Sequence, residues 1–436
     1  MKKLLFLLLV PALMRPVPSA AQTQGTTAPA FGISFSGFVK TDYFFDTREG
    51  VSIREGHFLL YPKEPNLDEN GVDINAKSSF NFLSIQSRLT GKITAPDAFG
   101  AKVTGVLEAD FFGNENASFV DANGFRLRHA YAKLNWEKTE LIAGQYWHPF
   151  FIPACFSGVV SFNTGAPFQP FSRNPQLRLT YRPGKISFTG VASAQRDFTS
   201  PVGTSALRYS TVPDITGLIA YESRNAEAKT EFVAGAAVDY KTLQPLLTTS
   251  RAGQTFVTDE KVSGLSATAF IKIGRPDFVY KIQAVYGQNL FDLIMLGGYV
   301  VSELADVNTN RVTYSTLNNL SMWTEFQTLG PKVQFGLWGG YSRNLGSKQE
   351  ILSYSNTVGG NAVTTRGANM KSLMRVSPRI VFIQGKFNFA TELEYTSAAY
   401  ATFQGDGTMN RDEFGVITDS ENVGNMRILL SAILNF

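Results

Sequence analysis

The residues most able to do covalent chemistry are few in this sequence. They are three histidines, His57, His129 and His148, and a single cysteine, Cys155. The histidines lack the spacing of metal ligands, and Cys155 has no histidine or carboxylate partner near it in the sequence, so we interpret it as a small buried residue. His148 alone stands where a catalytic base could act, but no sequence pattern gives it a partner. We therefore expect no enzyme, no metal and no cofactor, and keep a hydrolase built on His148 as the weaker alternative.

Charged side chains can also act without covalent chemistry, by attracting or repelling ions. In this sequence they recur at every second residue of segments that alternate apolar with polar residues. In a strand such residues share one face, and charges on a face that borders water influence which ions pass. Basic residues outnumber acidic residues on this face. The residues that we predict to line a passage and to set its selectivity are Arg88, Lys92, Lys102, Glu108, Asp110, Arg126, Arg128, Arg173, Arg178 and Arg182.

The segments that carry these charges alternate apolar with polar or small residues over about ten positions. The last segment shows this most clearly, with Ile428, Leu430 and Leu434 on one face and Arg427 and Ser431 on the other. A strand with lipid outside and a polar interior explains this division.

The second segment follows the same rule in our interpretation. Leu83, Ile85 and Leu89 are predicted to face outward, and Gln86 and Arg88 to face inward.

Sixteen such segments are expected, joined alternately by short turns and long loops. Besides the strand near 83–93, the predicted strands lie near 33–43, 101–112, 124–136, 140–148, 176–182, 185–196, 214–222, 227–241, 262–273, 278–287, 314–327, 333–343, 370–382, 386–399 and 421–436. The predicted long loops lie near 46–79, 113–123, 149–175, 197–213, 242–261, 288–313, 344–369 and 400–420. Short turns, long loops and an even strand count are typical of a membrane barrel.

The first residues predict export. Two lysines precede an apolar run, Leu4 to Val10, and Ser19-Ala20-Ala21 provides small residues for cleavage, so we assign residues 1–21 to a signal peptide. A membrane-anchoring helix is the alternative, but Pro11 interrupts the run, which is shorter than the roughly 20 residues that span a bilayer.

Composition excludes several classes of protein. Removal of residues 1–21 takes three residues from the 40 basic ones and leaves 37 against 36 acidic residues, with no basic run, so nucleic acid is not an expected partner. One cysteine allows no intrachain disulfide framework. Residues 22–436 show no linker, which favours a single domain. Together with the alternation, these features predict an all-β, transmembrane, antiparallel barrel of about 16 strands, with a soluble β-sandwich as the alternative.

Several motifs resemble Gram-negative outer-membrane proteins. The terminal Phe436 on an alternating strand resembles the signal that the barrel assembly machinery recognises. The stretches Thr94–Gly100, Arg126–Tyr131 and Gly144–Trp147 resemble a turn and the fourth and fifth strands of the trimeric porins, a group that includes the DcaP-like and phosphate-selective porins. The resemblance covers the whole mature chain.

The resemblance implies passive diffusion of small hydrophilic solutes through a homotrimer in the bacterial outer membrane, in contact with lipid and lipopolysaccharide. It also implies that the third loop, residues 149–175, folds inward as the constriction. A purely structural or adhesive barrel is the alternative function. The six phenylalanines of this loop are expected to pack it against the wall, and the alternative is that they line a path for solutes.

Arg88, Arg126 and Arg128 resemble the basic ladder of porin constrictions. The third loop contains no acidic residue to oppose them. We therefore expect unopposed guanidinium groups and a preference for anions. The alternative is that Glu108 and Asp110 neutralise the ladder.

Overall fold

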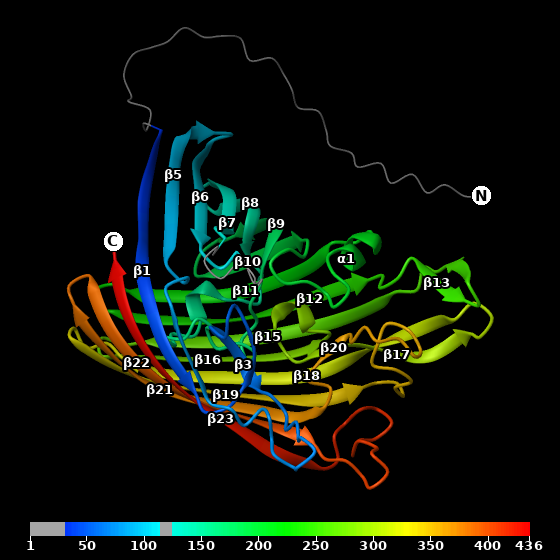
Figure 1. Ribbon diagram of the computed structural model, residues 1–436. Coiled ribbons are helices and arrows are strands. Elements are labelled where there is room, and N and C mark those ends of the chain that lie inside the picture. Colours follow the sequence, from blue (N-terminus) through cyan, green and yellow to red (C-terminus); the bar gives the residue numbers. More distant parts are fainter. Residues whose placement is uncertain (1–30, 114–123) are drawn as a thin grey trace, which may run out of the picture.

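The computed structural model describes residues 31–113 and 124–436, so the signal peptide expected at residues 1–21 lies outside the described residues. Within these ranges the main sheet contains 19 strands. Three of them are additional to the sixteen strands of the wall: β17 (Gly297–Asp306) and β20 (Thr365–Arg366) lie in loops, and β4 (Ser79–Leu83) is the detached first part of an interrupted wall strand. The other sixteen pair in an antiparallel ring, which confirms the expected all-β barrel (Figure 1).

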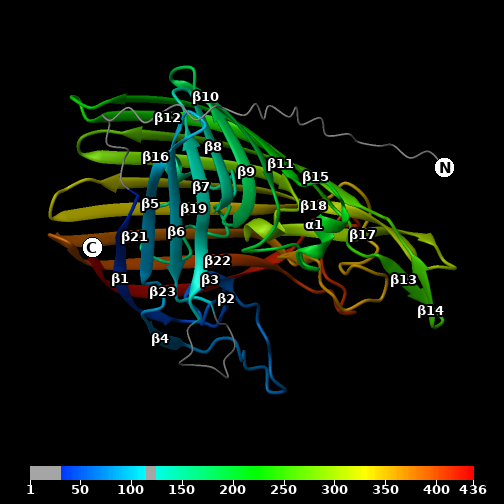
Figure 2. The same cartoon turned by 90° about the horizontal axis from the view of Figure 1, so that it is seen from above.

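The strands of the barrel wall follow one another around the ring in chain order. They are β1 (Gly32–Asp46), β5 (Arg88–Ala98), β6 (Ala101–Asp110), β7 (Arg126–Asn135), β8 (Thr139–Trp147), β9 (Arg173–Tyr181), β10 (Ile186–Ser193), β11 (Asp214–Asn225), β12 (Thr230–Leu243), β15 (Val262–Gly274), β16 (Phe278–Gln288), β18 (Arg311–Thr328), β19 (Val333–Ser347), β21 (Met370–Gln384), β22 (Phe387–Ala401) and β23 (Ser420–Asn435). The ring closes because β23 pairs with β1. In Figures 1 and 2 the first strands cross the direction of the later ones, since strands on opposite walls of a barrel tilt in opposite senses.

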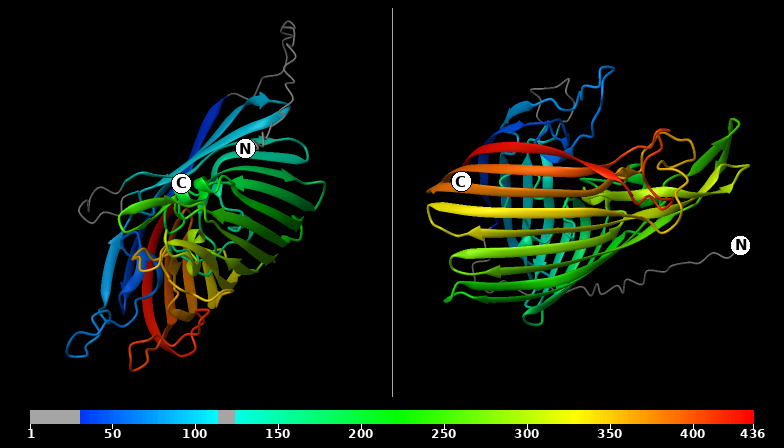
Figure 3. Two further views of the ribbon diagram at one scale, coloured as in Figure 1. Left: turned by 90° about the vertical axis from the view of Figure 1, so that its right-hand side faces the viewer. Right: turned by 90° about the horizontal axis from the view of Figure 1, so that it is seen from below.

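The connections alternate between short turns and long loops, as predicted. The turn between β5 and β6 comprises only Phe99 and Gly100, whereas residues 148–172 join β8 to β9. Figure 3 (right) shows short turns and the C-terminus at one end of the barrel and longer loops at the other. From here on, the third loop means residues 148–172.

The long loops contain short elements that the alternation did not predict. They are β2 (Gly50–Ile53), β3 (Phe58–Pro62), η2 (Pro153–Cys155), α1 (Ser205–Tyr209), β13 (Thr248–Arg251), β14 (Gln254–Val257) and η3 (Phe291–Leu293). Strands β2 and β3 form one hairpin, and β13 and β14 form another. No helix in the described part of the chain is long and apolar enough to cross a membrane.

The outer face of the wall is apolar and the inner face is polar. On β23, Ile428, Leu430 and Leu434 are exposed while Arg427 and Ser431 are buried, which confirms the predicted alternation. Leaving such an apolar side chain in water rather than burying it costs about 1.5–3 kcal/mol, and contact with lipid avoids this cost. The arrangement is the reverse of a soluble sandwich, whose apolar faces point inward.

The second predicted strand is interrupted, and part of its assigned face was wrong. Strands β4 and β5 pair with different stretches of β1, and a turn at residues 84–87 separates them. The turn shifts the alternation, so Leu83 and Ile85 pack inside the barrel, whereas Phe80 and Phe82 are exposed on its outside.

Gly144 permits the close pairing of β8 with β7. Its φ is +134°, and a Cβ atom there would lie 2.2 Å from the carbonyl oxygen of Ala130 and 2.6 Å from the Cα of Tyr131. Because both are backbone atoms, we expect Gly144→Ala to destabilise the barrel by about 1–3 kcal/mol. Heat-modifiability in SDS electrophoresis would show this as a lower unfolding temperature. Gly190→Ala is the matched control, since nothing lies within 4 Å of its new Cβ, and equal stability of the two variants would contradict the prediction.

Candidate functional site

Three neighbouring strands of the wall position the predicted arginines. The register of β5, β6 and β7 places Arg88 and Arg126 on either side of Asp110. The pairing of β6 with β7 then shifts by one residue, which makes a β-bulge at Arg128. Because of the bulge, Arg128 and the adjacent His129 are both buried, although strict alternation would place one of them outside.

Each arginine of these three strands has a carboxylate partner. Arg126 donates two hydrogen bonds to Asp110, of 3.0 Å from Nε and 2.8 Å from Nη2. Arg128 donates to Glu108 at 2.7 Å and to Asp110 at 3.0 Å. Arg88 is the most loosely paired, with its Nε 3.8 Å from a Glu108 oxygen.

Arg173, predicted on the third loop, is instead the first residue of β9. Its guanidinium donates to Asp197 at 2.9 and 2.5 Å, and Asp197 also lies 3.8 Å from Arg126. We call Arg88, Arg126, Arg128 and Arg173, together with their partners Glu108, Asp110 and Asp197, the arginine group. Four guanidinium groups face three carboxylates, so one positive charge remains. The expectation of unopposed guanidinium groups was wrong, because two acids of β6 and a distant loop acid pair with them.

Backbone groups of the third loop are bound by charged side chains of the wall. Lys40 on β1 donates to the Val160 carbonyl oxygen at 2.7 Å. On β18, Glu325 accepts a hydrogen bond of 2.8 Å from the Gly158 amide. The wall therefore supplies the charges that the third loop itself lacks.

Most phenylalanines of the third loop are packed. Phe150, Phe151, Phe162, Phe168 and Phe171 are buried. Phe168, for example, lies edge-on to Trp338 of β19, with 5.5 Å between ring centroids. Burial supports the packing interpretation for these five, whereas Phe156 is 43% exposed.

Two other loops add residues to the same apolar cluster. Phe58 and Tyr61 of β3, and Ile294 and Leu296 just after η3, are buried with four third-loop phenylalanines and with Trp323 and Trp338 of the wall. The four phenylalanines are Phe151, Phe162, Phe168 and Phe171. We call this set the inner cluster. Both regions were predicted only as long loops, although the apolar runs Phe58–Tyr61 and Leu293–Leu296 are a signal of burial.

A cavity of about 410 Å³ lies between the third loop and the arginine group. Arg88 and Arg128 line one side, and Phe156 with the backbone of residues 157–161 lines another. The Trp147 ring forms part of the lining of the cavity, and the Arg128 guanidinium lies over this ring, 5.8 Å from its centroid. Glu108, which pairs with both arginines, lines the wall side as well, so this side carries two guanidinium groups and one carboxylate, and the loop side is polar and aromatic.

The remaining predicted residues lie away from the arginine group. Lys92 on β5 and Lys102 on β6 are exposed. Arg178 on β9 stacks over the Tyr146 ring at 4.9 Å, and Arg182 is exposed in the turn that follows β9. Both arginines line a second cavity of about 210 Å³.

Cys155 is fully buried in η2, as expected, and burial raises the pKa of its thiol to about 12. Because only the thiolate reacts, and a raised pKa leaves little thiolate below pH 12, we expect maleimide to label the folded barrel at pH 8 at least about 100 times more slowly than the heat-unfolded chain. Mass spectrometry of samples quenched over time would measure both rates. Equal labelling of the folded and unfolded chains would contradict this burial.

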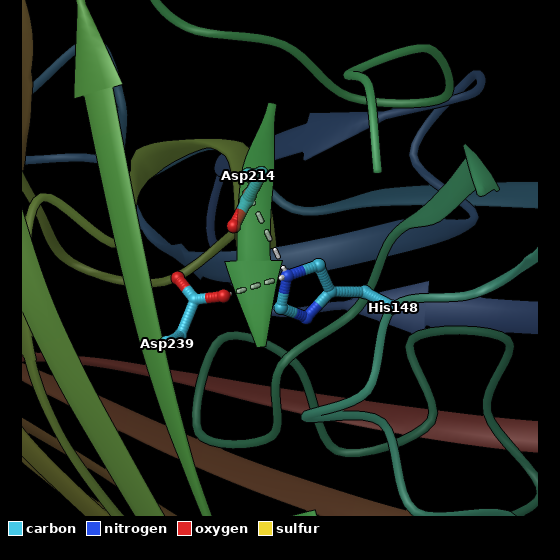
Figure 4. Close-up of side chains that lie close together, drawn as sticks. All are labelled: His148, Asp214 and Asp239. Atoms are coloured by element: carbon cyan, nitrogen blue, oxygen red, sulfur yellow. Dashed lines mark ion pairs between the residues drawn. The ribbon is translucent and has the colours of Figure 1, made fainter. Parts of the chain in front are cut away.

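His148 has partners that its sequence neighbours did not reveal. Its Nε2 lies 3.7 Å from a carboxylate oxygen of Asp214 on β11 and 3.7 Å from one of Asp239 on β12 (Figure 4). In the part of the chain that the structure describes, this is the group whose atoms are close enough to hold a metal ion. The prediction of no metal rested on the spacing of the histidines along the sequence, and such spacing does not reveal residues that the fold brings together from separate strands.

No family model matches the chain, and a search of curated proteins finds no similar sequence. Solved structures do match. The outer-membrane channel DcaP of Acinetobacter baumannii has a TM-score of 0.64 at 14% identity, covering 96% of this chain and 100% of that chain. An anion-selective porin from Comamonas acidovorans has a TM-score of 0.51 at 10% identity, covering 93% and 100%. These likenesses show that the chain has the fold of Gram-negative outer-membrane porins.

Proposed function

We propose that this protein is a porin of the bacterial outer membrane, through which small hydrophilic solutes, anions in particular, diffuse passively. The observation that carries the proposal is the cavity beside the arginine group, enclosed by a wall whose outer face is apolar. A barrel of sixteen strands encloses more space than its own wall side chains fill. The third loop, residues 149–175 in the sequence-based assignment, would form the constriction, because its backbone borders this cavity.

Anion preference is inferred from the charge balance of the arginine group. One positive charge remains after pairing, and Arg88, the most loosely paired guanidinium, lines the cavity. A net positive charge at a narrow point lowers the barrier for negatively charged solutes. We therefore assign selectivity to fewer residues than the sequence indicated, since Lys92 and Lys102 lie away from this point.

We infer in addition that the barrel is a homotrimer. It would be inserted by the barrel assembly machinery and would contact outer-membrane lipid and lipopolysaccharide. The exposed apolar belt supports contact with lipid. Stepwise conductance in groups of three would support the trimer, and single isolated steps would oppose it.

Planar-bilayer recording under a KCl gradient tests the proposed function. We expect open channels whose reversal potential has the sign of a chloride preference. A cation preference would overturn the anion assignment while leaving the porin assignment intact. A folded barrel that does not conduct would favour the structural or adhesive alternative, in which the inner cluster serves only to stabilise the barrel.

A further inference from the structure

His148, Asp214 and Asp239 form a buried group at the root of the third loop. His148 follows β8 directly, and its backbone amide donates to the Ser172 carbonyl oxygen at 3.0 Å, which joins the two ends of the loop. Asp214 begins β11, and Asp239 lies on the adjacent strand β12. Figure 4 shows the imidazole and both carboxylates directed toward one another.

The spacing within this group is unsuited to direct hydrogen bonds. Both Nε2-to-oxygen distances are 3.7 Å, beyond the range of a hydrogen bond. Two atoms that each lie about 2.1 Å from one tetrahedral zinc ion, at an angle of about 109°, are about 3.4 Å apart. The observed separation is therefore close to that of two ligands of a shared ion.

Three polar atoms of the group are buried and lack hydrogen bonds within the described residues. The side chains of His148 and Asp214 are at most 1% exposed. Within the residues described, neither Nε2 of His148 nor either oxygen of Asp214 has a hydrogen-bond partner. Asp239 accepts one hydrogen bond, from the Thr216 hydroxyl at 2.7 Å. Buried carboxylates without partners are costly, so this group requires a compensating charge.

The nearest cation, Lys241, attracts both carboxylates but donates its hydrogen bond to Asp292 at 2.5 Å, so it compensates them only in part. When both Asp214 and Asp239 are ionised, the group holds two negative charges, and one divalent cation would balance them.

We propose that His148, Asp214 and Asp239 bind a divalent transition-metal ion of the Zn²⁺ class. The imidazole nitrogen favours a transition metal over Ca²⁺ or Mg²⁺, which prefer oxygen ligands. Three protein ligands leave the fourth position of a tetrahedral ion for water. The ion would link the root of the third loop to β11 and β12.

Binding requires a change of tautomer in His148. The Phe150 amide donates to Nδ1 at 3.2 Å, so the neutral ring carries its proton on Nε2. A metal ligand needs the lone pair of Nε2, and the ring proton then moves to Nδ1 with no net release of protons. The Phe150 amide must turn away from Nδ1, so metal binding also shifts the backbone at the start of the third loop.

The test uses the full-length barrel in detergent, treated with a chelator and then titrated with Zn²⁺ by calorimetry. We expect one Zn²⁺ per chain, with binding at least about 100-fold weaker in Asp239→Asn and in His148→Ala. His57→Gln is the matched control, because His57 is also buried beside a carboxylate, Asp42 at 2.6 Å, but lies outside the group. This control should bind Zn²⁺ as the wild type does. The measurement does not depend on whether the barrel conducts ions.

A proton shared between Asp214 and Asp239 is the competing way to remove one of the two charges. Wild-type protein that binds no more Zn²⁺ than Asp239→Asn would overturn the proposal in favour of the shared proton. If a variant fails to fold, X-ray absorption at the zinc edge of the Zn²⁺-bound wild-type protein identifies the ligands of the ion instead. Nitrogen and carboxylate ligands together support the proposed site, and oxygen ligands alone contradict it.

Discussion

Replacement of Arg375 by methionine is expected to loosen the third loop and to raise the conductance of the channel. The Arg375 guanidinium donates to the Ala166 carbonyl oxygen of the third loop at 2.8 Å. It also donates to the Leu59 and Leu60 carbonyl oxygens of β3, at 3.2 and 2.7 Å, and lies 3.4 Å from Glu394. One buried side chain of β21 thus connects two loops to the wall.

The expected effect of Arg375→Met is large because the change leaves buried groups without partners. Methionine retains apolar bulk, but Glu394 loses its cation and three carbonyl oxygens lose a donor. Removal of one partner of a buried ion pair costs about 3–5 kcal/mol. Thermal unfolding should therefore begin at a lower temperature, and single-channel currents should be larger and noisier.

Two further variants control this experiment. Arg375→Lys keeps the charge but not the planar fork, so its stability and conductance should lie between those of Arg375→Met and the wild type. Lys102→Gln removes an exposed charge on β6 and should leave the loop unaffected. Wild-type conductance and stability in Arg375→Met would show that this residue does not hold the loop.

Arg88→Gln is expected to have the largest effect on ion preference. Arg88 lines the cavity and is the most loosely paired member of the arginine group, so its removal takes the group from one net positive charge to none. One charge at about 5 Å from a passing ion is worth about 0.8 kcal/mol in water, favourable for an anion and unfavourable for a cation, so the ratio of anion to cation permeability should change by about 1.7 kcal/mol, or roughly 16-fold. The reversal potential under a KCl gradient measures this ratio.

The control for Arg88→Gln is Lys92→Gln on the same strand. It removes the same charge from an exposed position away from the arginine group. A shift of equal size in both variants would mean that overall charge, rather than the arginine group, sets the preference. No shift in Arg88→Gln would place the selective residues elsewhere in the lumen.

The wall of the barrel could be predicted because its signal is local. Alternation along β23 depends only on neighbours within the strand, and the exposure of Ile428 beside buried Arg427 follows from it. Places where the alternation of inward and outward side chains is interrupted could not be predicted from neighbouring residues. The break at residues 84–87 and the bulge at Arg128 each shift the alternation by one residue without a distinctive residue type.

The candidate site was predicted only in part, because its partners come from distant segments. Arg88, Arg126 and Arg128 were found from their strand positions, and so were Glu108 and Asp110. Asp197 reaches the group from the loop after β10, and no pattern in the sequence fixes the path of that loop. The contacts of His148 with β11 and β12 could not be predicted either, because these strands are distant from His148 in the sequence.

The inner cluster has a consequence for how the outer loops tolerate change. Loops at the rim of a barrel are ordinarily the places that accept insertions. Here residues 57–62, the third loop and residues 293–296 share one packed interior, so an insertion in one displaces side chains of the others, and paired substitutions will not be additive. The β13–β14 hairpin lies outside the inner cluster and is largely exposed, which makes it the better place for an epitope tag.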